Sequence, residues 1–144
     1  METPTMGKVL VTAKIINLQD LYMAQQGHLP EAQVRSVEVT DAMADTGATS
    51  LMVPRRLIAQ LGVRPFRTRQ ARTSGGLVTL QVYEAVRMTV LDREYTGDVA
   101  EVPDDCPVLI GQIPLEALDL VVDPVGQRLI GNPAHGGEHV IELY

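Results

Sequence analysis

The segment Ala42-Met43-Ala44-Asp45-Thr46-Gly47-Ala48-Thr49-Ser50 joins three small apolar residues to a carboxylate and a glycine. The apolar residues predict a buried strand, and Asp45 stands where that strand would end, with Gly47 free to adopt backbone angles that are closed to other residues. A buried carboxylate without a partner costs several kcal/mol or shifts its pKa until it is neutral. Asp45 therefore requires either solvent or a second titratable group.

Strand patterns precede this turn. Residues 9–15 alternate apolar and polar side chains, which predicts a half-buried first strand. Residues 17–31 are mostly polar and predict a surface excursion with a short turn of helix at 20–25. Residues 34–39 resume strand character and lead into the segment that carries Asp45.

A helix and a hairpin are predicted after the turn. Residues 51–53 form a short apolar run, and apolar residues at helical spacing follow over 54–61. Pro54 suits the first helical position, and Gly62 suits the helix end. An arginine-rich connector then leads to Thr73-Ser74-Gly75-Gly76, which is a strong hairpin signal.

Strands dominate the remaining sequence. A long strand is predicted over 77–91, with a turn at Asp92-Arg93 and a returning strand over 94–102. A short apolar strand over 108–111 ends on glycine, and a short helix follows over 114–118. Two more strands, separated by an Asp-Pro-Val-Gly turn, and a C-terminal segment of strand composition are predicted at 120–122, 128–130 and 139–144.

Many short strands with one or two short helices favour an all-β fold, here a small closed β-barrel. The length of 144 residues suits one domain with its own core, which must be aliphatic because aromatic residues make up 3% of the chain. We expect residues 1–144 to form a single domain, with residues 1–7 disordered and residues 132–144 as a C-terminal tail. Cys106 has no partner for a disulfide, which favours a reducing compartment, and its acidic neighbours should raise the pKa of its thiol.

The net charge of −6 disfavours nucleic-acid binding by the domain as a whole. Six of the 12 basic residues nevertheless fall in the acid-free interval 46–83. We interpret them as a solvated helix face and loop; the alternative is a patch for an acidic substrate or nucleic acid, although no aromatics are interleaved for base stacking. The apolar run at 9–11 is too short for a signal peptide or a membrane span, so we expect a cytoplasmic protein without membrane contact.

The segment 42–50 resembles the active-site loop of the retropepsin-like aspartic proteases, whose Asp-Thr-Gly-Ala core it carries intact. The resemblance extends over about Val9 to Ile130, because the family's other features follow in the same order. These are a helix soon after the motif, a glycine-tipped flap hairpin, and an apolar-apolar-Gly strand before a second helix. They correspond here to 54–61, Ser74-Gly75-Gly76, and Leu109-Ile110-Gly111 before 114–118.

The resemblance implies an aspartic endopeptidase without a metal or cofactor. One chain supplies one Asp45, so a homodimer would bring two Asp45 carboxyl groups together on a two-fold axis. Thr46, Gly47 and Ala48 would support the active-site loop, with Thr46 bonding across the axis. The flap, Ser74-Gly75-Gly76, would close over an extended peptide, and Leu109-Ile110-Gly111 would back the loop. The N-terminal strand or a C-terminal strand over 140–144 is a candidate part of the dimer interface.

Some residues depart from the family pattern. Ala44 is smaller than the residue common before the motif, and Thr49 and Gln112 replace charged residues of the viral enzymes. Together these differences weaken any transfer of specificity or of interface salt bridges from the viral enzymes. The alternative function is a non-catalytic homodimeric module on the same fold, for peptide binding or dimerisation. His135 and His139 are interpreted as solvent-exposed loop residues rather than metal ligands, because glycines and a proline oppose a helix there.

Overall fold

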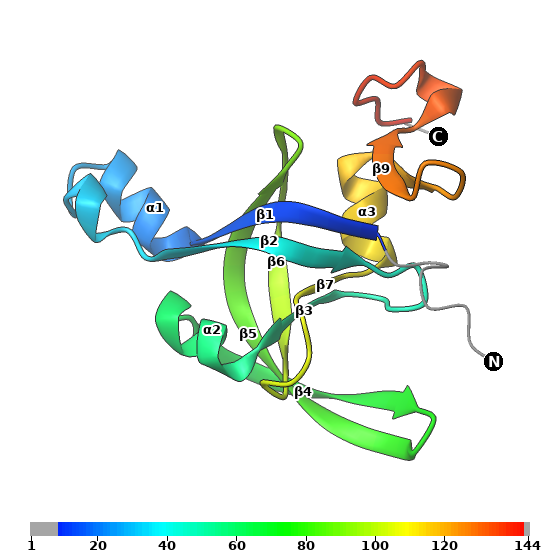
Figure 1. The fold of residues 1–144 in the computed structure, drawn as a ribbon. Coiled ribbons are helices and arrows are strands. Elements are labelled where there is room, and N and C mark those ends of the chain that lie inside the picture. The colour runs from blue at the N-terminus through cyan, green and yellow to red at the C-terminus, as the bar shows by residue number, and fades with distance from the viewer. Residues whose placement is uncertain (1–8, 143–144) are drawn as a thin grey trace.

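The structure is a computed structural model that describes residues 9–142, so the predicted disorder of residues 1–7 lies outside the described residues. Strands dominate, with three short α-helices and two 3₁₀ turns in the described part (Figure 1). The strands are β1 (Val9–Asn17), β2 (Ser36–Ala44), β3 (Leu51–Pro54), β4 (Arg64–Thr73), β5 (Gly76–Val90), β6 (Arg93–Val102), β7 (Leu109–Ile110), β8 (Leu120–Asp123) and β9 (Arg128–Gly131). The α-helices are α1 (Leu18–Gln25), α2 (Arg55–Leu61) and α3 (Gln112–Leu118), and the 3₁₀ turns are η1 (Glu31–Gln33) and η2 (Pro133–His135).

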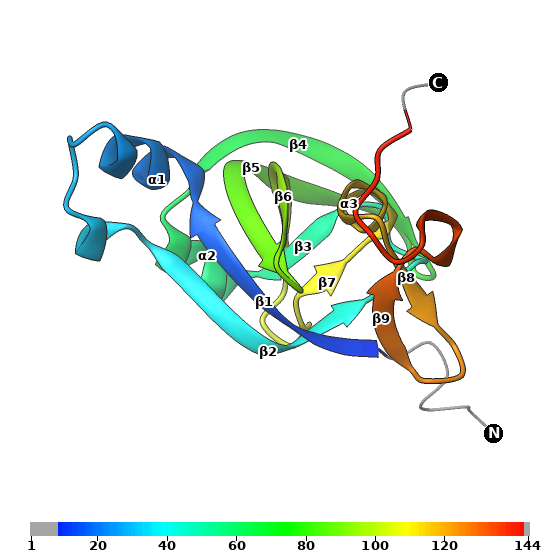
Figure 2. The same ribbon diagram turned by 90° about the horizontal axis from the view of Figure 1, so that it is seen from above.

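Seven strands form one sheet in the order β1-β2-β7-β3-β6-β5-β4. A further pairing of β1 with β5 closes six of them into a ring, which Figure 2 shows from above. This ring is what the structure shows of the predicted closed barrel, and the prediction of a mostly β fold is confirmed. Strands β8 and β9 form a separate antiparallel pair, also as predicted.

Aliphatic side chains fill the interior, as the low aromatic content requires. Alternate residues of β1 are buried, and so are Ala42 and Ala44, which flank Met43 on β2. The most deeply buried large side chains are Ile15, Leu51, Leu61, Met88, Ile110 and Leu118. Phe66, the one phenylalanine of the chain, is 48% exposed and lies outside this core.

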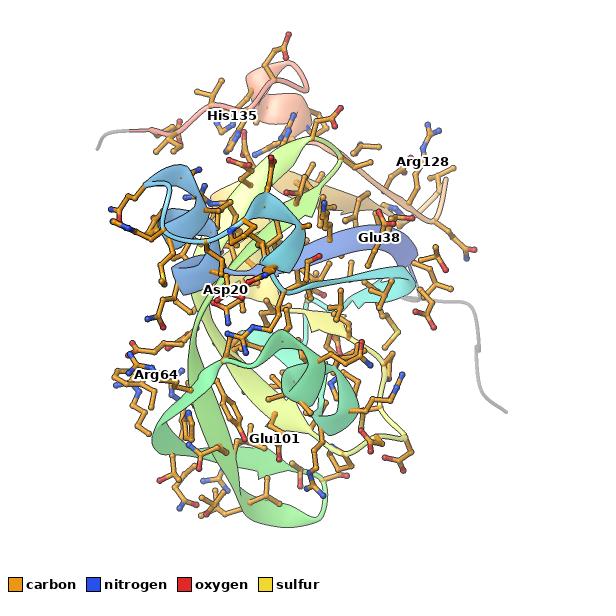
Figure 3. The ribbon with its side chains drawn as sticks, turned by 90° about the vertical axis from the view of Figure 1, so that its left-hand side faces the viewer. Asp20, Glu38, Arg64, Glu101, Arg128 and His135 are labelled. Atoms are coloured by element: carbon orange, nitrogen blue, oxygen red, sulfur yellow. The ribbon has the colours of Figure 1, made fainter. Side chains whose placement is uncertain are left out.

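The excursion over 17–31 is more ordered than predicted, and the expectation of one or two helices is wrong because α1 is a third. Asn17 caps α1 by accepting a hydrogen bond from Asp20 N at 3.0 Å, and it donates from Nδ2 to Leu61 O at 2.8 Å. Asp20 in turn accepts hydrogen bonds from Arg35 Nε and Nη2 at 2.8 and 3.0 Å. These contacts join α1 to Arg35, which directly precedes β2. Figure 3 shows Asp20, which lies on α1.

Helix α2 ends as predicted, at Gly62 with a left-handed φ of 64°. Its start differs, because Pro54 is the last residue of β3 and precedes the helix instead of opening it. The β5–β6 turn is also displaced by one residue. It is formed by Leu91 and Asp92, both with positive φ, so that Val90 pairs with Arg93.

The arginine-rich interval over 64–73 is not a connector. It forms β4, which pairs with β5 from Arg64 to the hairpin tip at Thr73 and Gly76. The interpretation of these arginines as part of a helix face and loop is therefore wrong for this interval. The sequence shows no period-two apolar pattern here because β4 is exposed on both faces along nearly its whole length.

The C-terminal segment is irregular where it is described. It begins with η2 and continues to residue 142 without a strand, so the predicted strand over 139–144 is not found in the described residues. His139 Nε2 lies 3.0 Å from Ala117 O on α3, which places the segment over that helix (Figure 2).

Candidate active site

The turn after β2 holds Asp45 by backbone hydrogen bonds. Asp45 N donates to Ile110 O at 2.9 Å, which continues the parallel pairing of β2 with β7 by one residue. Ala48 N donates to Asp45 O at 3.0 Å and so closes the turn. The Asp45 side chain is half-buried, so its carboxylate is fixed at a strand end while still reaching solvent.

Gly47 is adapted to this carboxylate in a way that differs from the expectation. Its φ is not in the left-handed region, so freedom of backbone angle is not what the position requires. Gly47 N instead donates to Asp45 Oδ1 at 2.9 Å, and a Cβ on Gly47 would approach the same oxygen to 3.2 Å. The glycine therefore allows its own N–H to come close to the carboxylate.

The loop is backed by β7 and the start of α3, the part of the chain that contains Leu109-Ile110-Gly111. Gly111 N donates to Ser50 O at 3.1 Å, and Gln112 N and Ile113 N donate to Ala48 O and Thr49 O at 2.8 and 2.9 Å. The first N–H groups of a helix have no partner within the helix, and here two of them bind the loop that follows Asp45. A Cβ on Gly111 would lie 2.5 Å from Ser50 O and 2.7 Å from Ser50 N, so only glycine fits.

A row of apolar side chains begins next to Asp45 on the face of the sheet opposite the core. Met43 pairs with Leu109, Leu109 with Met52, and Met52 with Ala100. Directly paired residues point to the same face, and their chain neighbours on β2, β3 and β7 point into the core. Met43, Met52 and Leu109 are only partly buried, so they offer an apolar surface beside the carboxylate.

The row continues to the hairpin β4–β5, because Ala100 also pairs with Val82 on β5, but Ala100 and Val82 are buried, unlike Met43, Met52 and Leu109. In both ribbon views the hairpin tip extends to the same side of the molecule as the turn after β2 (Figures 1 and 2). Thr73 Oγ1 orders this tip by accepting from Gly75 N at 3.1 Å and donating to Gly76 O at 2.9 Å. Ser74, Gly75 and Gly76 are all exposed.

Glu101 anchors the base of this hairpin. Its carboxylate accepts a hydrogen bond from Tyr83 Oη at 2.7 Å and pairs with Arg55 Nε at 3.1 Å. Burial and the nearby Glu101 carboxylate raise the pKa of Tyr83, so the phenol keeps its proton for this bond. Figure 3 shows Glu101 and Arg64 where the hairpin leaves the body of the molecule.

These features agree with a family model described as aspartyl protease, which matches residues 31–131. The chain belongs to the aspartyl protease family. The matched range contains the Asp45 turn, the hairpin and the backing strand, which are the parts of the chain that the resemblance identified. No curated protein matches the chain.

The aspartyl protease match leaves out β1, α1 and the segment after β9. In this chain β1 nevertheless completes the ring, because it pairs with both β2 and β5. Thr46 is exposed at the surface of the single chain, and its bond across a two-fold axis stays a prediction. The same holds for the supporting role of Ala48 beyond the bonds given above.

A second cluster of polar side chains in this chain lies around Asp119, which follows α3. His135 Nδ1 lies 2.6 Å from Asp119 Oδ2, and Asn132 Nδ2 and Val140 N donate to the same carboxylate at 3.2 and 3.1 Å. These bonds, His135 first, lower the pKa of Asp119 to about 2, and the carboxylate raises the pKa of His135. The interpretation of His135 as a solvent-exposed loop residue is therefore wrong.

Sequence offered one signal for this second cluster, the dipeptide Asn132-Pro133. Asn before Pro is typical of a helix start, and Asn132 Oδ1 accepts from Ala134 N at 3.0 Å at the start of η2. Arg93 fastens the same segment by donating to Gly137 O and Asp119 O at 2.6 and 2.8 Å. Figure 3 shows His135 far from the base of the hairpin, so this cluster lies apart from the flap.

Within residues 9–142, no group of three or more His, Cys, Asp or Glu side chains could hold a metal ion. No helix in the same range is long and apolar enough to cross a membrane. Burial, followed by the Asp105 carboxylate, raises the pKa of the Cys106 thiol, which confirms the predicted direction.

Proposed function

We propose that the chain is an aspartic endopeptidase that acts as a homodimer, with one catalytic Asp45 from each subunit. The observation that carries this proposal is the half-exposed Asp45 carboxylate on a turn whose backbone is bonded to β7 and α3. The backbone of residues 45–50 is ordered by these bonds and presents one acid. A binding module does not need an acid in such a position. Membership of the aspartyl protease family supports the same chemistry.

Two carboxyl groups are needed because the reaction requires an acid and a base. Aspartic proteases are the known instance of two adjacent carboxyl groups that cannot both ionise and therefore share one proton. This sequence contains a single Asp-Thr-Gly segment, so the second carboxyl group must come from another chain. A two-fold axis beside Asp45 would bring the second carboxyl group into place, because both subunits then use the same surface for the contact.

In the proposed reaction the ionised carboxylate takes a proton from water, and the water oxygen attacks the carbonyl carbon of the peptide bond. The protonated carboxyl group of the other Asp45 gives its proton to the carbonyl oxygen. The resulting diol collapses when the first carboxyl group passes its proton to the amide nitrogen and the C–N bond breaks. The second carboxylate regains a proton from a diol hydroxyl group, and both are ready for another cycle.

The substrate proposed is an extended peptide with apolar side chains at the scissile bond. Support comes from the partly buried Met43, Leu109 and Met52 next to Asp45, because unbranched methionines adapt to apolar partners of different shape. Ser74-Gly75-Gly76 is proposed to close over the peptide, whose backbone can hydrogen-bond to the hairpin.

The first test compares wild type with Asp45→Asn on a denatured protein substrate. The variant keeps the size of the side chain and its bond to Gly47 N, so the fold should persist while cleavage is lost. Wild-type activity should follow a bell-shaped pH profile on the acidic side of neutral, because the pair must hold one proton. Cleavage by purified Asp45→Asn, or a rate still rising above about pH 8, would contradict the assignment.

The second test concerns association. Specific activity should fall on dilution, and mixing wild type with excess Asp45→Asn chains should inactivate it through mixed dimers. Full activity of a species that sediments as a monomer would overturn the shared site. A dimer that binds peptides but cleaves none would instead support the non-catalytic alternative.

A further inference from the structure

The arginines of β4 are the feature that the proposed reaction leaves unused. Arg64, Arg67, Arg69 and Arg72 lie on one strand of an acidic protein, and all four are exposed. The register of β4 with β5 divides them between the two faces of the hairpin. Arg67 pairs with Val82, and Arg69 pairs with Leu80. Arg72 pairs with Leu77 and points to the opposite face of β4.

Arg67 and Arg69 therefore point to the face that carries the apolar row. Val82 belongs to that row through its pairing with Ala100, and directly paired residues share a face. An ion pair supports this orientation independently, because Arg67 Nη2 lies 3.8 Å from Asp98 Oδ2, and Asp98 has the same alternation on β6 as Ala100. The row thus runs from Met43 beside Asp45 to a pair of arginines on the flap.

The two arginines differ in their partners. Arg67 forms an ion pair with Asp98. Arg69 has no hydrogen-bond or ion-pair partner among residues 9–142, and its neighbours on the same face are the apolar Ala71, Val78 and Leu80. Arg69 therefore presents an unneutralised guanidinium above an apolar surface, which is the environment in which Arg binds a carboxylate well.

We propose that Arg69 binds an acidic side chain of the peptide substrate and gives the enzyme a preference for Asp or Glu near the scissile bond. This inference rests on the proposed function for its substrate and its site. Adjacent strands are about 4.8 Å apart, so β4, which carries Arg69, lies about 24 Å along the sheet from Met43 on β2, the length of roughly seven extended residues. The acidic residue is therefore expected within about seven residues of the scissile bond. It is expected on both sides, because the two-fold axis supplies two copies of Arg69.

The test measures peptide binding so that it does not depend on turnover. Full-length Asp45→Asn protein is titrated against two fluorescent peptides that differ only in one residue, Glu or Gln, on one side of an apolar cleavage pair. The Glu peptide should bind about fivefold more tightly at low salt, the size expected of one exposed ion pair, and the difference should shrink as salt is added. A scan of the Glu along the peptide finds the preferred position.

Arg69→Gln in the same background should abolish the difference, and Arg69→Glu should reverse it in favour of a Lys peptide. Arg72→Gln is the matched control, because it removes the same charge from the other face of the same strand. An unchanged preference in Arg69→Gln, an equal loss in Arg72→Gln, or no preference at any position in the starting protein would overturn the inference.

Cleavage assays on wild type separate this inference from the proposed function. Wild type should cleave the Glu peptide with a higher kcat/KM than the Gln peptide, and Arg69→Gln should lose that advantage through KM. If wild type cleaves neither peptide but the Asp45→Asn protein still prefers Glu, the endopeptidase proposal fails while the role of Arg69 stands. If wild type cleaves both peptides equally at every position of the Glu, the endopeptidase proposal stands and the role of Arg69 fails.

Discussion

His135 Nδ1 lies 2.6 Å from Asp119 Oδ2 and thereby joins the C-terminal segment to the end of α3. Their pKa shifts set a pH window for this contact. The lowered pKa of Asp119, about 2, means that its contribution to stability is present above the ordinary Asp pKa and is lost as pH falls towards 2. The raised pKa of His135 means that its contribution is complete below the ordinary His pKa and is lost as pH rises through the raised value.

We predict that alkaline pH loosens residues 132–142 while the ring of strands persists. Hydrogen exchange of Val140 N, which donates to Asp119, should accelerate once His135 loses its proton. His135→Gln should exchange quickly at all pH values. Exchange that is slow and equal in both proteins across this range would show that the pair does not hold the segment.

Gly111→Ala should disturb the active-site loop. A Cβ there would meet Ser50 and Thr49 backbone atoms within 2.7 Å, and backbone atoms cannot move aside as a flexible side chain can. Overpacking of this kind costs about 1–3 kcal/mol of unfolding free energy, and activity should fall further because the loop carries Asp45. Gly75→Ala is the matched control for thermal melting, because its new Cβ would meet nothing closer than Thr73 Oγ1 at 3.8 Å. Equal melting temperatures for both variants would contradict the close fit.

Gly76→Val should reduce turnover more than it reduces stability. Gly76 has a φ of 112°, a conformation that a β-branched residue resists at a cost of about 1–3 kcal/mol, and the hairpin tip is exposed. Gly75 does not have a positive φ, so strain is expected at Gly76 alone of this pair. Thermal melting and kcat/KM of Gly76→Val and Gly75→Val are to be compared. Full activity of Gly76→Val would remove the flap from the mechanism.

Asp20→Asn should destabilise the fold by about 1–3 kcal/mol in urea unfolding. The carboxylate accepts hydrogen bonds from Arg35 N, Nε and Nη2, and an amide cannot accept all three. The Arg35 hydrogen bonds lower the pKa of Asp20, so its stabilisation is present above the ordinary Asp pKa and fades as pH falls through the lowered value. The two proteins should therefore converge in stability in acid. Glu94→Gln, which changes an exposed carboxylate on β6, should match wild type.

The strand-turn-helix outline could be predicted because its signals are local. Gly62 ends α2, alternating residues bury one face of β1, and the Asp45 turn is followed by a backing strand and α3, all within short windows of sequence. Asp45 could be singled out for the same reason. The need for glycine at position 111 could not be predicted, because it arises from contact with the backbone of Ser50, 61 residues earlier in the chain.

The missed features depend on distant partners. Nothing in the composition of β4 marks it as a strand, and it is held by pairing with β5 from Arg64 to the hairpin tip. His135 is partly buried and contacts Asp119 in a segment that folds back over α3, which no spacing between histidines can reveal. The special backbone angles expected of Gly47 are not found, and its N–H approach to Asp45 could not be predicted because it depends on a side-chain orientation.

Strand β4 also gives the molecule a large electric dipole. Residues 64–83 contain four arginines and no acid, so with a net charge of −6 for the whole chain the remainder carries −10. Two copies that approach at low ionic strength will turn so that the hairpin of one meets the acidic body of the other, because their fields reach about 30 Å at 0.01 M salt and about 8 Å at physiological salt. The orientation of a first encounter is thus set by ionic strength before any side chains touch.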